Sequence, residues 1–216
     1  MIYYSTMEAP SNAFDLDIAE LLSMLPSTCE KSILKYHQKK DQINSLIGKL
    51  LLRKLSLEVN HYNDFLDLKI DCKTGRPFLS DYIDFNISHS DNLVACALTI
   101  NAKVGIDVEL IRSIDFSEFN EVFNIEEMKE VNRDSFFKLW TRKESALKAI
   151  GLGFALDPKK INCSLSSNSI YVSEVSSDTW WFYKIVHSER YSGTICSNQC
   201  NAELKNIKYT ISELMV

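Results

Sequence analysis

The chain has 216 residues, of which 45% are hydrophobic and 25% are charged, and its formal net charge is −5. This is the composition of an ordinary globular protein, and the length allows one domain or two small ones. The acidic balance argues against a nucleic-acid binder, which usually carries a basic surface, and no apolar run is long enough to cross a bilayer.

The first hundred residues predict a mixture of helices and strands. Apolar residues recur at helical spacing in the longest segment, and shorter runs alternate as half-buried strands do. The expected helices are Leu16–Leu25, closed by Pro26, and Glu30–Leu57, which is mostly helical. The expected strands are Ile2–Tyr4, Phe65–Asp71 and Ile83–Ile87, with a Gly- and Pro-containing turn at residues 73–77.

Two further strands, Leu93–Ile100 and Val104–Leu110, predict a hairpin across residues 101–103. In the second strand, apolar residues alternate with Gly105, Asp107 and Glu109, and the glycine leaves room for close backbone approach. The two carboxylates therefore project from one face, about 7 Å apart along the strand. Like charges this close repel at a half-buried site unless a cation lies between them.

Residues 117–133 carry many acids and few apolar side chains, so we expect a mobile, exposed segment there. Phe136–Gly151 predicts a helix, with Asp134 as a candidate N-cap and Gly151 as a left-handed C-terminal residue. Its expected core-facing stripe consists of Phe136, Leu139, Trp140, Ala146, Leu147 and Ile150. Lys143 lies within that stripe, so either its stem reaches the edge or its charge has a buried partner.

Glu144 and Lys148 are four residues apart and are therefore neighbours at the edge of the same stripe. Alone they predict only a solvated ion pair. Together with Asp107 and Glu109, however, they supply three carboxylates for a hard divalent ion. Mg²⁺ takes oxygen ligands and usually binds a few carboxylates together with substrate phosphates.

The rest of the chain predicts successive strands joined by turns. Their expected bounds are Lys159–Leu165, Ile170–Val175, Trp180–Val186, Tyr191–Ser197 and, at the edge, Lys208–Ile211. The six cysteines are scattered without metal-ligand spacing, and the N-terminus lacks the features of a signal peptide. We therefore expect reduced thiols and a cytoplasmic protein.

GIDVE at 105–109 followed by WTRKESALK at 140–148 resembles the paired signature of the 4′-phosphopantetheinyl transferases. The similarity is to the longer, single-chain type that activates surfactin synthetase and other peptide and polyketide synthetases. FNISHS at 85–90, GRP at 75–77 and the helical residues 36–53 are also similar to segments of that family. The resemblance implies an α+β fold of two similar halves related by a pseudo-twofold. Each half would pack a long helix on a small antiparallel sheet, with the active site in the cleft between them.

The resemblance also implies a function. A transferase of this family moves the 4′-phosphopantetheine group of coenzyme A to a serine hydroxyl of an acidic acyl or peptidyl carrier protein and releases 3′,5′-ADP. Residues 1–100 would hold the coenzyme A phosphates, and residues 101–216 would carry the metal ligands and the catalytic helix of a monomer. Asp107, Glu109 and Glu144 would bind Mg²⁺, Glu144 would accept the serine proton, and Lys148 would stabilise the phosphates. The residues implied for coenzyme A are Lys40, Ser45, Lys73, Arg76, Asn86, Ser88, His89 and Lys148.

Three points stay open at this stage. In a gapless comparison, two early basic positions that hold the 3′-phosphate in relatives fall on Cys29 and Ser32, so Lys31 or Lys35 would have to substitute. The D-x-E and E-x-x-x-K patterns could also build a metal-dependent phosphodiesterase or nuclease. A non-catalytic binding module that keeps the fold is the third reading.

Overall fold

The computed structural model describes residues 1–10, 18–60, 69–70, 76–80, 82–119, 121–152, 156–172, 177–185 and 187–214. The first half contains β1 (Ile2–Glu8), α1 (Ile18–Ser23), α2 (Ser27–Leu34), α3 (Lys39–Asn60), β2 (Lys69–Ile70), β3 (Pro77–Phe78), β4 (Ile83–Ser90) and β5 (Leu93–Ile100). The helix expected over Glu30–Leu57 is thus two helices, α2 and α3, with a break between Leu34 and Lys39.

The second half begins with the strand that carries the paired acids. It contains β6 (Val104–Leu110), the 3₁₀ helix η3 (Phe116–Phe119), α4 (Ile125–Glu130), α5 (Phe136–Ile150), the 3₁₀ helix η5 (Pro158–Lys160), β7 (Ser169–Tyr171), β8 (Thr179–Ile185), β9 (Tyr191–Ser197), β10 (Leu204–Asn206) and α6 (Ile211–Leu214). No helix in the described ranges is both long and apolar enough to cross a membrane.

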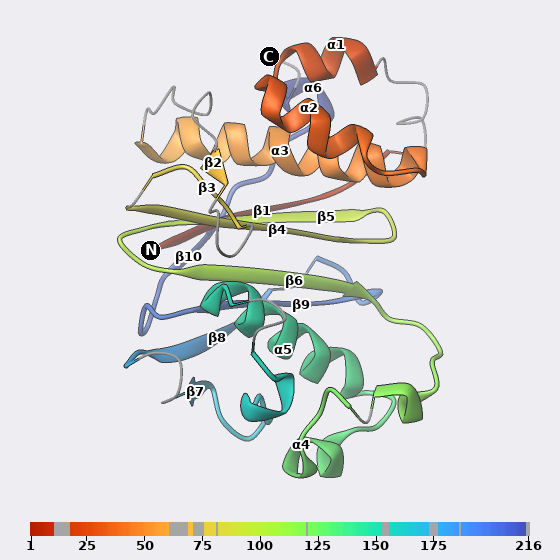
Figure 1. Ribbon diagram of the computed structural model, residues 1–216, viewed down its shortest axis with the longest axis vertical. Coiled ribbons are helices and arrows are strands. Elements are labelled where there is room, and N and C mark those ends of the chain that lie inside the picture. The colour runs from red at the N-terminus through yellow and green to blue at the C-terminus, as the bar shows by residue number, and fades with distance from the viewer. Residues whose placement is uncertain are drawn as a thin grey trace.

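The elements form four layers, with α3 on one four-stranded sheet, α5 on another, and the two sheets between the helices (Figure 1). The first sheet has the order β10-β1-β5-β4, and the second has the order β6-β9-β8-β7. The predicted α+β architecture of two halves is confirmed. The C-terminus returns to the first half, because β10 pairs in parallel with β1.

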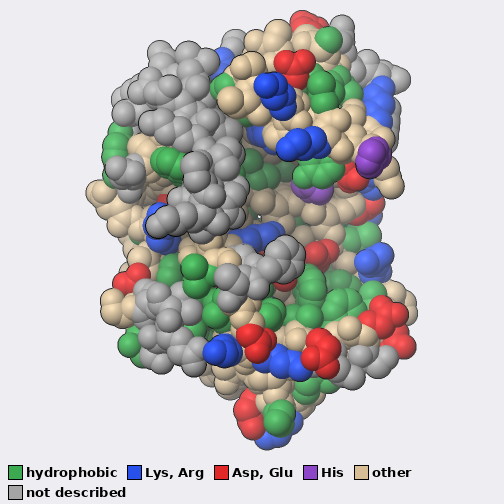
Figure 2. Space-filling view, in the orientation of Figure 1, with side chains coloured by type: hydrophobic (Ala, Val, Ile, Leu, Met, Phe, Trp, Pro, Cys, Tyr) green, Lys and Arg blue, Asp and Glu red, His purple; other side chains and the backbone are tan. Residues whose placement is uncertain are grey.

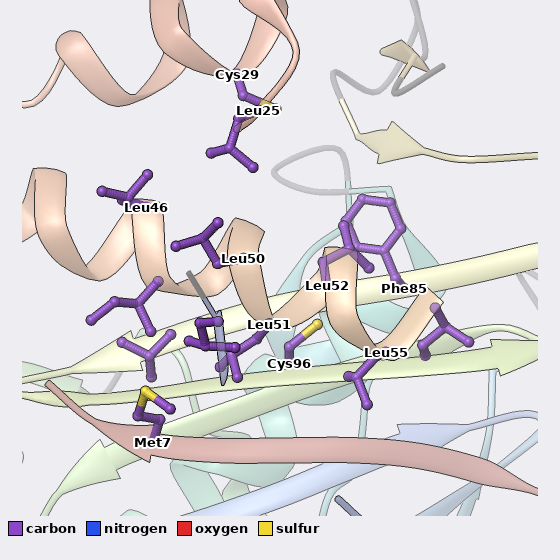
Figure 3. Close-up of a cluster of buried hydrophobic side chains, with 14 of the residues drawn as sticks. Met7, Leu25, Cys29, Leu46, Leu50, Leu51, Leu52, Leu55, Phe85 and Cys96 are labelled. Atoms are coloured by element: carbon purple, nitrogen blue, oxygen red, sulfur yellow. The ribbon is translucent and has the colours of Figure 1, made fainter. Parts of the chain in front are cut away.

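Alternation along the strands divides the core between these layers. Val94, Cys96 and Leu98 pack with the leucines of α3, and Figure 3 shows Cys96 beside them. Leu93, Ala95 and Ala97 face β6 and β9 of the second sheet. Strand β5 is therefore buried on both faces, which explains its almost uninterrupted apolar sequence.

The expected hairpin of Leu93–Ile100 with Val104–Leu110 is wrong. β5 pairs with β1 and β4, and β6 pairs with β9, so the two strands belong to different sheets. The expected strand at Lys159–Leu165 contains η5 instead, and the chain after β10 ends in α6 rather than in a strand at Lys208–Ile211. Local alternation identified most strands, but it could not tell which strands pair.

Residues 117–133, which were expected to form a mobile, exposed segment, are packed against α5 instead. Phe116, Phe119 and Phe123 surround Phe136 at ring-centroid distances of 5.2, 4.8 and 5.7 Å, and Trp140 joins the same aromatic cluster. Among the acids, Glu127 of α4 is completely buried. The high acid count of residues 117–133 drew attention away from Phe119 and Phe123, which pack on α5 together with the preceding Phe116.

Helix α5 is Phe136–Ile150, and Gly151 follows it with a φ of 78°, as predicted. The N-cap is Ser135 rather than Asp134, and its side chain makes no capping hydrogen bond. Asn132 Oδ1 accepts hydrogen bonds from the backbone N–H groups of both residues. Of the two environments expected for Lys143, the structure shows the second, in which its charge has a buried partner. It pairs with Glu127 at 2.6 Å, and both side chains have no exposed surface.

The Glu127 carboxylate also accepts hydrogen bonds from the backbone N–H groups of Asn124 and Cys163, and Lys143 donates to the carbonyls of Pro158 and Ile161. We expect Glu127→Ala to lower the free energy of unfolding by about 3–5 kcal/mol, because the Lys143 ammonium is left buried without a countercharge. Urea unfolding followed by circular dichroism measures this loss.

Glu126→Ala is the matched control, because Glu126 is the next residue and pairs with Lys129 at 2.8 Å on the surface. It should cost no more than about 1 kcal/mol. Equal losses in the two variants would contradict a structural role for the buried pair.

Gly105 is required by the approach of α5 to β6. A Cβ atom there would lie 2.1 Å from the carbonyl oxygen of Ser145 and 2.5 Å from the nitrogen of Ala149, both backbone atoms of α5. We expect Gly105→Ala to cost about 3 kcal/mol or more in unfolding free energy, since the helix itself must move. In Gly193→Ala the new methyl meets a side-chain atom of Ile185 at 2.7 Å, and rotation of that side chain should make the loss smaller. A loss for Gly105→Ala no larger than for Gly193→Ala would contradict this account.

Candidate functional site

The edge of β6 that faces β4 is covered by side chains instead of by another strand. Side-chain oxygens of β4 accept hydrogen bonds from backbone N–H groups of β6, at N···O distances of 2.7, 3.0, 3.4 and 3.1 Å. The pairs are Asp84 with Val104, Asn86 with Ile106, Ser88 with Val108, and Ser90 with Leu110. We call this arrangement the side-chain ladder. The ladder joins the two halves along this edge of β6, and one face of the strand packs against α5.

Asp107 and Lys148 meet on that face. Lys148 Nζ donates to Asp107 Oδ1 at 2.6 Å, to Ser88 Oγ at 3.2 Å and to the carbonyl of Ile106 at 3.3 Å. Ser88 Oγ also donates to Asp107 Oδ1 at 2.9 Å. Residues from three predicted motifs therefore converge at one point between the halves.

Glu109 is held by one residue from each half. Ser90 Oγ donates to Glu109 Oε2 at 2.6 Å, and the indole N–H of Trp140 donates to Glu109 Oε1 at 3.3 Å. Neither Ser90 nor Trp140 was among the site residues predicted from the sequence. The alternation of polar residues along 84–90 was the available signal for Ser90, whereas Trp140 was assigned to the core stripe.

The carboxylates leave the site short of positive charge. Burial raises the pKa of Asp107 to about 7, and Glu109 and Glu144 add to the rise while Lys148 opposes it. Burial also raises the pKa of Glu144, again against the effect of Lys148. Asp107 Oδ2 is buried and has no hydrogen-bond partner among the described residues.

The described residues include no group of three or more His, Cys, Asp or Glu side chains close enough together, as they stand, to hold a metal ion. The donors nevertheless fit Mg²⁺ in kind, because they are carboxylate oxygens, one of them is an orphaned buried atom, and a nearby cation would relieve their mutual repulsion.

A cavity of about 500 Å³ adjoins these residues, and Figure 2 shows the molecule hollowed between its halves on this face. Its polar lining consists of Arg76, Asn86, Glu144, Lys148 and Asp157. Its apolar wall comes from Val122, Trp140, Leu147, Leu156 and Pro158. Trp140 and Leu147, expected in the core, therefore border the cavity. Such a mixture suits a ligand with both an anionic and an apolar part.

Arg76 bridges the two halves. Its guanidinium donates to Asp84 Oδ2 at 2.7 Å and to the carbonyl of Val104 at 2.7 Å, and it reaches the carbonyls of Lys148 and Ala149 at the end of α5. The sequence predicted a phosphate contact for Arg76, and the structure shows this bridging role. Lys73, the other residue of this turn that was predicted to bind phosphate, lies outside the described residues.

The remaining predicted phosphate contacts lie along α3 and β4. Lys40 pairs with Asp91 at 2.5 Å, and Ser45 Oγ accepts a hydrogen bond from Lys49 Nζ at 2.8 Å. His89 is half-buried at the end of β4, and its ring meets Tyr36 edge to face with centroids 6.4 Å apart. Lys49 was not predicted from the sequence, because it reads as one more polar residue on a long amphipathic helix.

Geometry and sequence comparison together define an α+β protein of two halves with an acid–lysine site between them. A family model for the N-terminal part of 4′-phosphopantetheinyl transferases matches residues 12–101, and a model of the 4′-phosphopantetheinyl transferase superfamily matches residues 103–196. The chain belongs to the 4′-phosphopantetheinyl transferase superfamily.

Three relatives illustrate the similarity. The 4′-phosphopantetheinyl transferase Gsp of Aneurinibacillus migulanus is 40% identical over 131 residues, which cover 57% of this chain and 55% of Gsp. Sfp of Bacillus subtilis is 32% identical over 141 residues, covering 61% of this chain and 62% of Sfp. The L-aminoadipate-semialdehyde dehydrogenase-phosphopantetheinyl transferase of Rattus norvegicus is 28% identical over 163 residues, which cover 65% of this chain and 52% of that relative. The matched region thus spans only part of each relative.

The side-chain ladder makes a specific prediction for amide exchange. In Asn86→Ala, the N–H of Ile106 loses its acceptor, and its hydrogen exchange should accelerate by roughly fivefold or more, the equivalent of one hydrogen bond. The N–H of Val104, which binds Asp84, is the internal control and should keep its exchange rate. Native-state exchange followed by NMR measures both, and unchanged exchange at Ile106 would contradict the ladder.

Proposed function

We propose that this protein transfers the 4′-phosphopantetheine group of coenzyme A to a serine hydroxyl of an acyl or peptidyl carrier protein and releases 3′,5′-ADP. One observation carries the proposal. Asp107, Glu144 and Lys148, which come from distant parts of the sequence, meet beside a cavity between the halves of a protein that belongs to this superfamily. A diphosphate near Lys148 and a pantetheine arm along the apolar wall match the two kinds of lining.

Asp107, Glu109 and Glu144 would hold Mg²⁺, which when bound polarises phosphoryl oxygens and neutralises developing charge. Ser90 and Trp140 orient Glu109 for this task, because they hold its two oxygens from opposite halves. Residues 1–100 would then carry the coenzyme A contacts, and residues 101–216 the carboxylates and catalytic helix.

The protein's own side chains supply binding, orientation and proton transfer. The bond from the serine oxygen to the β-phosphorus forms as the bond from that phosphorus to the 3′,5′-ADP oxygen breaks. Glu144 accepts the serine proton, directly or through water, and its raised pKa makes it a better base than an ordinary carboxylate. Lys148 donates hydrogen bonds to the phosphates, because it lines the cavity and Ser88 and Asp107 position its ammonium.

The remaining contacts of coenzyme A are assigned to Lys40, Ser45, Lys73, Arg76, Asn86, Ser88 and His89. We further propose a monomer in the cytoplasm, a location that suits the five free cysteines of the described residues. An acidic carrier protein would be met by local basic side chains such as Lys138, since this chain is itself acidic.

Transfer is tested with purified protein, coenzyme A, Mg²⁺ and a panel of carrier proteins. Mass spectrometry should show a gain of one phosphopantetheine group on a carrier protein, dependent on coenzyme A and Mg²⁺. Glu144→Gln and Asp107→Asn should each reduce the rate by about 100-fold or more, with the circular dichroism spectrum retained. Glu203→Gln, a change at an exposed residue outside the cavity, is the control and should keep the wild-type rate. Near wild-type transfer by Glu144→Gln or Asp107→Asn would overturn the assignment.

A further inference from the structure

Lys49 is a half-buried lysine for which the described part of the chain supplies no counter-ion. Its ammonium donates a hydrogen bond to Ser45 Oγ at 2.8 Å, and it forms no ion pair with any carboxylate of the described residues. Three other buried or half-buried lysines each have an acidic partner, Lys40 with Asp91, Lys143 with Glu127 and Lys148 with Asp107. A hydroxyl satisfies one donor of an ammonium but does not neutralise its charge.

Removing a cation from water without a countercharge is costly, so such a group normally deprotonates or binds an anion. Burial does lower the pKa of Lys49, although the nearby Cys29 thiol opposes the shift. Nearby groups able to bind an anion are the Ser45 hydroxyl and, at the end of β4, the His89 imidazole, which also interacts with the Asp41 carboxylate. This arrangement of a cation, a hydroxyl and an imidazole is suited to a phosphate.

The position of Lys49 relative to Lys148 indicates which phosphate it would bind. His89 interacts electrostatically with both Lys49 and Lys148, so it lies near both ammonium groups. Coenzyme A carries two separate anionic groups, the diphosphate and the 3′-phosphate. If the diphosphate lies at Lys148, where transfer occurs, the 3′-phosphate is the anion left for Lys49.

We infer that Lys49, with Ser45, binds the 3′-phosphate of coenzyme A and makes the protein select coenzyme A over 3′-dephospho-coenzyme A. This inference rests on the proposed function. It replaces the sequence-based alternatives Lys31 and Lys35, whose side chains are exposed; a phosphate bound to an exposed lysine gains little, because water already solvates both charges.

Calorimetric titration of the wild-type protein with coenzyme A and with 3′-dephospho-coenzyme A tests the inference without requiring transfer. The wild type should bind coenzyme A at least about tenfold more tightly, as expected for a charge-assisted hydrogen bond. In Lys49→Met this preference should fall to within about twofold, with the affinity for 3′-dephospho-coenzyme A unchanged, and Lys49→Arg should restore it. Lys54→Met, on the same helix, is the matched control and should keep the full preference.

Three results would overturn the inference: an undiminished preference in Lys49→Met, the same loss in Lys31→Met or Lys35→Met, or no preference in the wild type. Each of them leaves the proposed function standing if transfer from coenzyme A still occurs. Failure of the wild-type protein both to bind coenzyme A and to modify any carrier protein would overturn the proposed function as well.

Discussion

The side-chain ladder between β4 and β6 is the constraint on which the rest of the structure depends. An exposed strand edge normally pairs with another strand or is protected from pairing. Here the polar side chains of one sheet satisfy the edge of the other. The halves are thereby joined without merging into one continuous sheet, and the junction itself becomes the site. Ser88 and Ser90 take part in the ladder and also donate hydrogen bonds to Asp107 and Glu109. The same two hydroxyl groups therefore join the halves and orient the carboxylates.

The charges at this junction are arranged so that a ligand completes them. On the second half, Lys148 interacts with both Asp107 and Glu144, Glu109 adds a further negative charge, and burial raises the pKa of Asp107 and of Glu144. On the first half, Lys49 has a hydroxyl partner and no carboxylate among the described residues. The excess negative charge calls for a cation and the excess positive charge for an anion. A magnesium complex of coenzyme A would satisfy both at once.

A second buried contact shapes the wall of the cavity. The Glu127–Lys143 pair ties α4 to α5 and to residues 158–163, so the loop that contributes Val122 and Phe123 packs against α5. A buried ion pair is not by itself stabilising, but breaking one is costly. It therefore favours a single arrangement of this segment, which is why a stretch so rich in acids is ordered.

The sequence by itself determined the helix Phe136–Ile150 with its terminal glycine, the strand that carries Asp107 and Glu109, and the superfamily, because helical and strand periodicity and short motifs are local properties of the chain. It also narrowed Lys143 to two environments. Tertiary structure alone decided that β5 and β6 belong to different sheets, that Arg76 bridges the halves and that Ser90 and Trp140 hold Glu109. It also decided that Lys49 binds a hydroxyl and no carboxylate of the described residues. Strand pairing, side-chain burial and charge neutralisation depend on which distant residues come together, and local periodicity does not determine those contacts.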